Sequence, residues 1–269
     1  MEKKEAYNFT SKDAENYDIY LGPVLFEPYG RYLASRIDEA NLSSVIELAC
    51  GTGRVSGHIS NALPAAVEFW ATDISIDMLD IAKRRLGNGK INFKTEDIQN
   101  LSFADNSFDL AVCQFGMMFL PDKQRGFNEI SRILKPGGKL MCFTWDSTQH
   151  NPLFKLLINE LMLPYFEGED TARFFVPFSL YDAQQLAEWM ANAGFTSIKT
   201  ETVALNSGIA TPEQIEAGFY LQHPLGKAVR DKDPAAFEIV RRKFRREVEK
   251  RYGSTVSFPM QALLTVGVK

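Results

Sequence analysis

Short apolar runs alternate with segments in which apolar residues recur every three or four positions over the first half of the chain. Runs of the first kind are typical of buried strands, and the spacing of the second kind is typical of helices that bury one face. Regular alternation of strands and helices predicts a parallel sheet with helices on both sides. The expected strands lie at about 44–49, 67–73, 91–97, 107–114 and 139–145.

Capping residues mark the ends of the intervening helices. Ser75 and Asp122 each precede an apolar helical pattern, and their side-chain oxygens suit the first N–H groups of a helix. The glycine-rich stretch 87–89 and the Pro-Gly-Gly stretch 136–138 are expected to end these two helices. A further helix is expected at about 53–62, directly after the first strand.

The second half of the chain has a different pattern. Residues 147–180 are rich in Phe, Leu and Pro and lack strand alternation, which predicts short helices. Residues 206–252 predict two more helices, because Thr211-Pro212 and Asp233-Pro234 each place a capping residue before a first-turn proline. The remaining elements are a capped helix at 182–194 and strands at about 196–205 and 258–268.

No internal repeat or low-complexity linker divides the chain. Its 269 residues are enough to bury a sizeable core, so we predict one catalytic domain over 1–269. Within it we expect an N-terminal helical cap at 1–42 and two helical insertions, at 147–180 and 206–252, that form a lid over the substrate.

Residues 45–53, with the sequence VIELACGTG, carry the strongest functional signal. An apolar run ends in Glu47, a glycine-rich turn follows, and a second acid, Asp73, closes the next expected strand. A strand, a tight turn and a helix in this order hold nucleotide-like cofactors at the strand ends of a doubly wound sheet. A cofactor site is therefore the first hypothesis.

The residues of this turn favour one class of cofactor over another. A dinucleotide fingerprint has glycine at the position of Ser56, and a pyrophosphate gains nothing from an acid such as Glu47. S-adenosylmethionine (SAM) carries an ammonium group and two ribose hydroxyls, which suit Glu47 and Asp73 respectively. Glycine at 51 and 53 lets the backbone approach such a cofactor without an intervening Cβ.

Composition narrows the functional classes further. A net charge of −4 and a pI near 5.6 argue against a general nucleic-acid binder. Cys50, Cys113 and Cys142 lie far apart in apolar segments, so we expect reduced core thiols and neither a disulfide framework nor a metal site. The N-terminus is polar, and no apolar run reaches the ~18 residues of a spanning helix, which favours a cytoplasmic protein without a membrane span.

Four stretches share an order and spacing with a known family. They are IELACGTG at 46–53, ATDIS followed by ML at 71–79, EDIQNLSFADNSFDLAVCQFGMMFLPD at 96–122, and NEISRILKPGGKL at 128–140. Together they resemble the class I SAM-dependent methyltransferases, specifically the branch of the ubiquinone/menaquinone-biosynthesis methyltransferases. The resemblance implies an α/β, Rossmann-like, doubly wound sheet of seven mostly parallel strands whose last strand is antiparallel, plus helical lid insertions. One departure is Ala49, which stands where the family has glycine.

The resemblance also implies which residues contact SAM. Glu47 would contact the methionine amine through water or backbone, Asp73 would accept both ribose hydroxyls, and Asp97 would accept from the exocyclic amine of adenine. The alternative for Asp73 and Asp97 is an ordinary loop or capping acid. The other positions carried over are Ala49, Gly51, Gly53 and Gln114 beside the methionyl and ribose moieties, and Ile74, Met78 and Ile98 beside the adenine. The apolar members of this set also suit a plain core role.

Methyl transfer depends mainly on alignment of the two reactants, so a base is not obligatory. If the acceptor must lose a proton, histidine suits neutral pH. His150 follows the fifth expected strand and His223 lies in the second insertion, and both are candidate general bases. His58, on the helix after the glycine turn, is the weakest of the three. The alternative for each is a surface or capping role.

Three further segments allow two interpretations each. Tyr20 or Tyr17 in the N-terminal segment closes over SAM, or the segment packs as an amphipathic helix. Aromatic residues at 173–178, with Tyr165 and Phe166, line an apolar acceptor pocket or form the core of the lid. The helix at 234–251 places Arg and Lys side chains opposite an apolar face, which favours a solvated surface; the alternative is attraction to an anionic acceptor or a membrane surface.

These observations predict a methyltransferase that moves the sulfonium methyl of SAM to an O, N or C nucleophile of a small molecule by in-line displacement. The stretch QFGMMF at 114–119 departs from the asparagine- and arginine-containing signature of the quinone enzymes at this point, so the acceptor stays open. The first alternative is a methyltransferase of RNA or protein, and the second is a nucleotide-binding oxidoreductase or a SAM-binding protein without turnover. The acidic net charge and the lack of a tetrapeptide such as NPPY weigh against the first. We expect no nucleic-acid partner, and peripheral contact with a membrane stays open.

Overall fold

The computed structural model describes residues 11–38, 40–87 and 89–269. The chain divides into two compact units. The unit we call the helical unit comprises 1–28, 147–176 and 204–261, and the sheet unit comprises 29–146, 177–203 and 262–269. Residues 1–10 of the predicted cap and Asn88 of the predicted helix stop lie outside the described residues.

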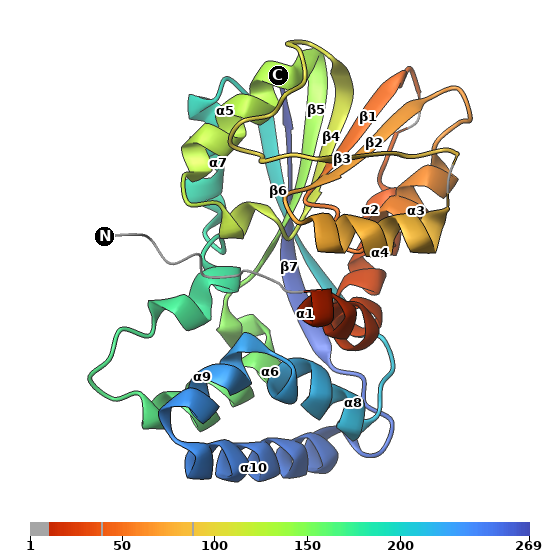
Figure 1. Ribbon diagram of the computed structural model, residues 1–269. Coiled ribbons are helices and arrows are strands. Elements are labelled where there is room, and N and C mark those ends of the chain that lie inside the picture. The colour runs from red at the N-terminus through yellow and green to blue at the C-terminus, as the bar shows by residue number, and fades with distance from the viewer. Residues whose placement is uncertain (1–10, 39, 88) are drawn as a thin grey trace. The chain divides into compact units, whose positions relative to one another are not determined.

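One seven-stranded sheet has the strand order β3-β2-β1-β4-β5-β7-β6 (Figure 1). Strands β1 to β5 pair in parallel, whereas β7 runs antiparallel to β5. The strand order reverses between β1 and β4, which is the topological switch point of a doubly wound sheet. The predicted fold class is therefore confirmed. The strands are β1 (Ser44–Leu48), β2 (Glu68–Asp73), β3 (Asn92–Thr95), β4 (Phe108–Gln114), β5 (Leu134–Trp145), β6 (Thr196–Asn206) and β7 (Pro259–Val268).

Helices cover both faces of the strands in the sheet unit. Figure 1 shows α3 and α4 on one side and α5 and α7 on the other. The predicted caps of α4 and α5 are confirmed, since Ser75 Oγ accepts from Met78 N–H and Asp122 Oδ1 accepts from Arg125 N–H. The helices that belong wholly or mostly to this unit are α2 (Glu27–Ser35), α3 (Arg54–Ala62), α4 (Ile76–Leu86), η2 (Met117–Phe119), α5 (Lys123–Ile133) and α7 (Ala183–Asn192).

The helix before β5 ends earlier than the sequence predicts. Helix α5 stops at Ile133, and Leu134 is already extended, with φ −75° and ψ 142°. Lys135 precedes a proline, which disfavours the helical conformation, so the chain leaves the helix before the Pro-Gly-Gly stretch. That stretch lies instead within β5, where the pairing shifts between Phe108–Leu134 and Leu110–Lys139.

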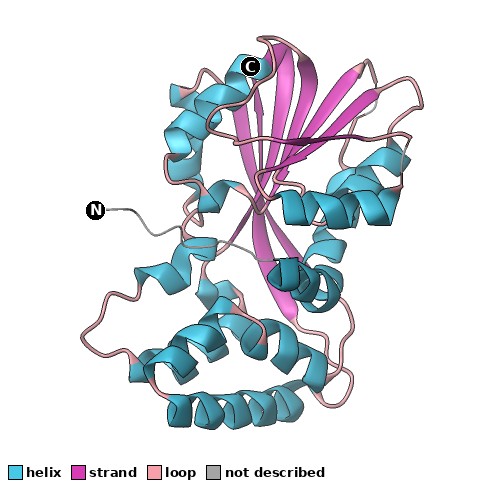
Figure 2. Cartoon of the chain, in the orientation of Figure 1, coloured by secondary structure: helices cyan, strands magenta, loops and turns pink. Residues whose placement is uncertain are grey.

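Short helices dominate the helical unit, and Figure 2 shows them as separate cyan segments. Residues 206–252 hold more helices than the two predicted, because Pro224 begins an additional helix for which His223 is the N-cap. The caps predicted at Thr211 and Asp233 are confirmed. The helices are α1 (Ser11–Asn16), η1 (Tyr17–Phe26), η3 (Thr148–His150), α6 (Pro152–Phe154), η4 (Lys155–Met162), η5 (Leu163–Tyr165), η6 (Ala172–Phe178), α8 (Pro212–Glu216), η7 (Ala217–Leu221), α9 (Pro224–Lys232) and α10 (Pro234–Tyr252).

Helix α10 packs through one apolar face, as its sequence predicts. Phe237, Val240, Phe244 and Val248 are all buried. Tyr220 stacks on Phe237 with ring centroids 5.0 Å apart, and its hydroxyl donates to Phe237 O at 3.1 Å. Among the described residues, no helix combines the length and the apolar character that crossing a membrane requires.

Candidate functional site

The candidate residues with the strongest sequence signal gather at the carboxyl ends of neighbouring strands. Leu48 of β1 pairs with Thr72 of β2 and Cys113 of β4, and Asp73 pairs with Thr95 of β3. These four strands therefore end at one edge of the sheet. In open α/β sheets this edge, beside the topological switch point, is where ligands bind.

Asp73 organises the glycine turn that follows β1. Its Oδ2 accepts from Gly51 N–H at 2.8 Å, and its Oδ1 accepts from Ser75 N–H at 2.9 Å. The turn is also held by Cys50 N–H, which donates to Thr72 O at 2.8 Å. Asp73 of β2 is thus hydrogen-bonded directly to the glycine turn that follows Glu47 on β1.

The two glycines of the turn have different physical roles. Both have positive φ, 56° at Gly51 and 77° at Gly53, which favours glycine. A Cβ on Gly53 would lie 2.8 Å from the Cβ of Ala82 on α4, whereas a Cβ on Gly51 would meet no atom within 4 Å. Gly53 is therefore required for helix packing, and Gly51 faces open space that a ligand can enter.

Ala49 also has a left-handed backbone, with φ 53°. Its methyl group is accommodated by Gly116 after β4, where a Cβ would lie 2.5 Å from that of Ala49. Phe115, next to Gly116, has φ 59° and stacks on Trp145 with ring centroids 4.0 Å apart. Sequence analysis missed Phe115 and Gly116, although a glycine directly after an apolar strand signals a close backbone approach.

Glu47 is the most unusual side chain of the site. It is only 1% exposed, and its Oε2 has no hydrogen-bond partner among the described residues. The pKa of Glu47 is raised to about 8, mainly by burial; the neighbouring Ser56 hydroxyl lowers this pKa and the charge of Asp73 contributes to raising it. Ser56 Oγ is itself buried without a partner of good geometry. Buried polar groups are nearly always paired, so this pair marks a place for a ligand group.

The carboxyl group of Asp73, like that of Glu47, has a pKa set by burial and by neighbouring hydrogen-bond donors. Burial raises the pKa of Asp73, while the N–H groups of Ser75, Gly51 and Ile74 lower it. The two carboxyl groups are close enough for the charge of Asp73 to act on Glu47, and no Lys or Arg of the described residues is among the groups that shift their pKa values. A cationic group beside Glu47 and neutral hydroxyls beside Asp73 would satisfy both. The ammonium and ribose hydroxyls of SAM fit this donor set.

The predicted adenine contacts fall into two groups. Ile74 is 69% exposed beside Asp73, which is unusual for a large apolar side chain and suits a planar ring. Met78 and Ile98 are buried, as core residues are. Asp97 follows β3, and its Oδ1 accepts from Gln99 N–H at 2.9 Å. The contacts of these four residues with adenine stay predictions.

The remaining candidates lie farther along the chain. Gln114 is buried at the end of β4, beside Phe143 of β5. Tyr20 lies in η1 and His150 at the end of η3, both in the helical unit. His58 lies on α3. The roles proposed for these residues also stay predictions.

His223 has the capping role that the sequence offered as the alternative to a general base. Its Nδ1 accepts from Leu225 N–H at 3.2 Å, which caps α9 ahead of Pro224. Burial of the ring lowers the pKa of His223 to about 4, although the residue keeps some exposure. The aromatic residues of the first insertion also pack on one another, with Phe166 and Phe174 edge to face at 4.9 Å. This contact fits the lid-core interpretation.

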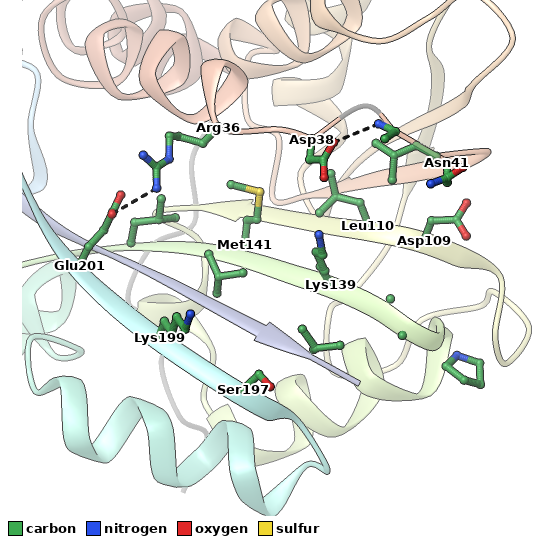
Figure 3. A pocket seen from close by; sticks show the side chains of 18 of the residues that line it. Arg36, Asp38, Asn41, Asp109, Leu110, Lys139, Met141, Ser197, Lys199 and Glu201 are labelled. Carbon is green, nitrogen blue, oxygen red and sulfur yellow. Dashed lines mark hydrogen bonds and ion pairs between the residues drawn. The ribbon is translucent and has the colours of Figure 1, made fainter.

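A concave region of the sheet unit, of about 940 Å³, lies toward the amino-terminal halves of β4, β5 and β6 (Figure 3). Leu110 and Met141 lie on its floor, and Lys139 and Lys199 line it. Arg36 at its rim pairs with Glu201 at 3.3 Å. None of its lining residues belongs to the glycine turn, so it is distinct from the candidate cofactor site.

Comparisons with known proteins agree with this geometry. A methyltransferase-domain family model matches residues 45–138. Demethylmenaquinone methyltransferase of Paenarthrobacter aurescens is 32% identical over 198 residues, which cover 69% of this chain and 76% of that protein. The ubiquinone/menaquinone biosynthesis C-methyltransferase of Geotalea daltonii is 29% identical over 214 residues, covering 74% of this chain and 90% of that protein.

The fold also matches solved methyltransferase structures. A phosphoethanolamine N-methyltransferase of Haemonchus contortus, solved with phosphomonomethylethanolamine and S-adenosylhomocysteine, superposes with a TM-score of 0.59 and 16% identity. The match covers 97% of this chain and 57% of that chain. At this identity the likeness concerns the fold. Together with the sequence relatives, it places the chain among the class I SAM-dependent methyltransferases, in the ubiquinone/menaquinone-biosynthesis branch, as an enzyme that uses SAM to methylate a small molecule.

Proposed function

We propose that the carboxyl-terminal edge of β1 and β2 holds SAM, with the amine at Glu47 and the ribose hydroxyls at Asp73. The observation that carries this assignment is the buried, unpartnered Oε2 of Glu47 beside Asp73. An ammonium donor at this oxygen would satisfy it and favour the ionised carboxylate. Gly51, whose missing Cβ leaves open space, would let the cofactor approach the backbone of the turn.

The other cofactor contacts follow the strand ends outward. Ile74 and Met78 would flank the adenine, and Asp97 and the N–H of Ile98 would bond its edge. Asp97 Oδ1 is already used by Gln99 N–H, so Oδ2 is the oxygen we assign to the adenine amine. Ala49, Gly53 and Gln114 would lie beside the methionyl and ribose moieties, and Tyr20 would close over them.

We infer that the methyl acceptor is an electron-rich carbon of a small aromatic ring that carries hydroxyl groups. The names of the relatives, demethylmenaquinone methyltransferase and C-methyltransferase, support this class. SAM supplies an electrophilic methyl group, which the acceptor carbon takes by in-line displacement as the carbon–sulfur bond breaks. Alignment of such reactants can account for ~7–11 kcal/mol of a barrier in favourable cases.

The acceptor loses one proton when the new carbon–carbon bond forms. We assign this proton to the imidazole of His150 rather than to that of His223, because Nδ1 of His223 already accepts a backbone hydrogen bond. We further propose that the N-terminal segment and the two insertions bind the acceptor, within one methyltransferase domain over 1–269. A cytoplasmic location is supported by three cysteines that are buried and free.

Calorimetric titration with SAM, S-adenosylhomocysteine and NADH in parallel tests the cofactor assignment. Micromolar binding of the first two ligands and none of NADH is the expected result. Tight NADH binding without SAM binding would overturn it. With [methyl-¹³C]SAM and a panel of hydroquinones, phenols and amines, NMR of the products then identifies the acceptor atom. A product labelled only on oxygen or nitrogen would refute carbon methylation while leaving the cofactor assignment intact.

A further inference from the structure

Helix α10 and its neighbour α9 carry a strong charge asymmetry. Residues 224–252 contain ten Lys and Arg against five Asp and Glu, an excess of five positive charges in a chain whose net charge is −4. The rest of the chain therefore carries −9. Charge concentrated in this way orients a protein toward a surface of opposite sign.

Two rows of cations on α10 differ in their ion pairs. Arg241 pairs with Glu216 at 3.1 Å and Glu238 at 2.8 Å. Arg245 pairs with Glu213, with Glu216 at 3.2 Å and with Glu249 at 2.6 Å. This inner row of arginines is thus neutralised by carboxylates from α8 and from α10 itself.

The outer row of α10 has only one such partner, and it lies near one end of the row. Arg242, Lys243 and Arg246 are exposed and make no ion pair with any described residue. Lys250 continues the row and has only Glu247, at 3.9 Å. The apolar face of the same helix is buried against its own unit, so the outer row is not needed for packing. We call Arg242, Lys243, Arg246 and Lys250 the outer row.

The spacing of the outer row also works against helix stability. Arg242, Arg246 and Lys250 follow one another at i, i+4 and i+8, and like charges four residues apart weaken a helix. Among the carboxylates of α10, only Glu247, 3.9 Å from Lys250, relieves part of this repulsion, because Glu238 and Glu249 pair with the arginines of the inner row. Three unneutralised cations, Arg242, Lys243 and Arg246, kept at such a cost point to an anionic partner.

We propose that the outer row of α10 docks the protein on an anionic lipid surface. Ile239 lies on the same helical face, three or four residues before Arg242 and Lys243, and is 38% exposed. An apolar side chain among cations suits the boundary between headgroups and acyl chains. A nucleic acid is disfavoured, because both phenylalanines of α10 are buried and offer no face on which bases stack. The inference does not depend on the acceptor assigned above.

Vesicle sedimentation tests the proposal with the full-length protein. We expect binding to vesicles of equal parts phosphatidylglycerol and phosphatidylcholine, little binding to phosphatidylcholine alone, and release by high salt. The triple variant R242E/K243E/R246E should bind the anionic vesicles at least tenfold more weakly. The matched control K90E/K139E/K199E has the same net charge, changes only exposed lysines of the sheet unit, and should bind within about threefold of the parent.

Comparison of the two triple variants shows whether vesicle binding depends on the position of the cations on α10 or only on the net charge of the protein. Equal loss in the two triple variants, or equal binding to both vesicle types, would overturn the proposal. Tight binding of tRNA with no binding to anionic vesicles would overturn it in favour of a nucleic-acid partner. Circular dichroism and thermal midpoints of both variants should match the parent, and the milder R242Q/K243Q/R246Q variant gives the same comparison if charge reversal disturbs folding. Cofactor binding should be unchanged in every variant, so failure here is distinct from failure of the cofactor assignment.

Discussion

Two nearly buried glutamates, one in each unit, differ in whether the protein supplies partners for their carboxyl oxygens. Glu216 of the helical unit is 6% exposed in its residue surface and lies between Arg241 and Arg245, at 3.1 and 3.2 Å. Glu47 of the sheet unit is 1% exposed, and one of its oxygens has no partner. The protein itself supplies partners for the carboxylate of Glu216, whereas Oε2 of Glu47 is available to a ligand.

The difference distinguishes a structural charge from a binding charge. Leaving a buried polar group unpaired costs about 1–3 kcal/mol, and more when the group is charged. Glu47 avoids part of this cost by holding a proton, since burial raises its pKa to about 8. A site that cannot satisfy its own carboxylate is preorganised for a cation, and SAM brings one.

Of the variants considered, Asp73→Ala should reduce SAM binding most strongly. The substitution removes the acceptor of the ribose hydroxyls and the anchors of Gly51 N–H and Ser75 N–H. Hydrogen bonds to charged groups contribute about 1.5–3 kcal/mol each, so SAM affinity should fall by about a hundredfold or more in calorimetry. Asp122→Ala, which removes the cap of α5, is the matched control. It should lower the thermal midpoint without changing SAM affinity, and an equal loss of affinity in both variants would contradict the assignment.

Glu47→Gln should remove a pH dependence. Because the folded-state pKa of Glu47 is about 8, above the ordinary 4.5, the folded protein keeps a proton that the unfolded chain releases as pH rises. The contribution of Glu47 to stability therefore decreases from about pH 5 to pH 8, and Gln should flatten this decrease in denaturant unfolding.

The same variant reports on the cofactor. An ammonium beside Glu47 favours the ionised form, so SAM binding should release a proton and strengthen by up to about tenfold between pH 6 and 7. In Glu47→Gln both effects should disappear. Calorimetry in two buffers with different ionisation enthalpies counts the released protons. Proton release that survives in the variant would show that another group is responsible.

Sequence predicted most of the sheet unit because its signals are local. Apolar runs located the strands, and Ser75 and Asp122 located two helix starts through hydrogen bonds to residues three positions away. The predicted stop at 136–138 lies later than the observed end of α5 at Ile133, because Pro136 acts through the residue before it and not only at its own position. For His223 the sequence left a base and a cap as alternatives, and the hydrogen bond to Leu225 N–H, ahead of the helix that Pro224 begins, shows the cap.

The sequence indicated which residues form the candidate site, but not which of their polar atoms are hydrogen-bonded and which lack a partner. The order of Glu47, Gly51 and Asp73 along the chain indicated a SAM-like cofactor. The missing partner of Glu47 Oε2 and the hydrogen bond between Gly51 and Asp73 depend on how β1 and β2 align. No periodicity or spacing encodes whether a buried oxygen finds a donor, so these features required the three-dimensional structure.

Glu216→Gln tests the structural side of the comparison. It removes the charge shared by Arg241 and Arg245 but keeps the volume, and both arginines retain other carboxylates, Glu238 and Glu249 among them. The free energy of unfolding should fall by about 1–2 kcal/mol, because the arginines are partly exposed and screened by solvent. SAM affinity should stay within twofold. Glu249→Gln, at an exposed pair, should cost less than about 0.5 kcal/mol. A larger effect at Glu249 than at Glu216 would mean that burial does not strengthen this network.

Ala49→Gly is the smallest change and asks whether the binding turn stores strain. A left-handed conformation costs an L-residue about 1–2 kcal/mol, and Ala49 has φ 53°. Glycine relieves that cost but loses about 0.5–1 kcal/mol through its more flexible unfolded state, so a net gain of up to about 1 kcal/mol is expected. Ala187→Gly, inside α7, should instead lose about 0.5–1 kcal/mol. Denaturant unfolding of the two variants should therefore give shifts of opposite sign. If both variants were destabilised, the methyl of Ala49 against Gly116 would matter more than its backbone, and the turn would be held by packing rather than strained for binding.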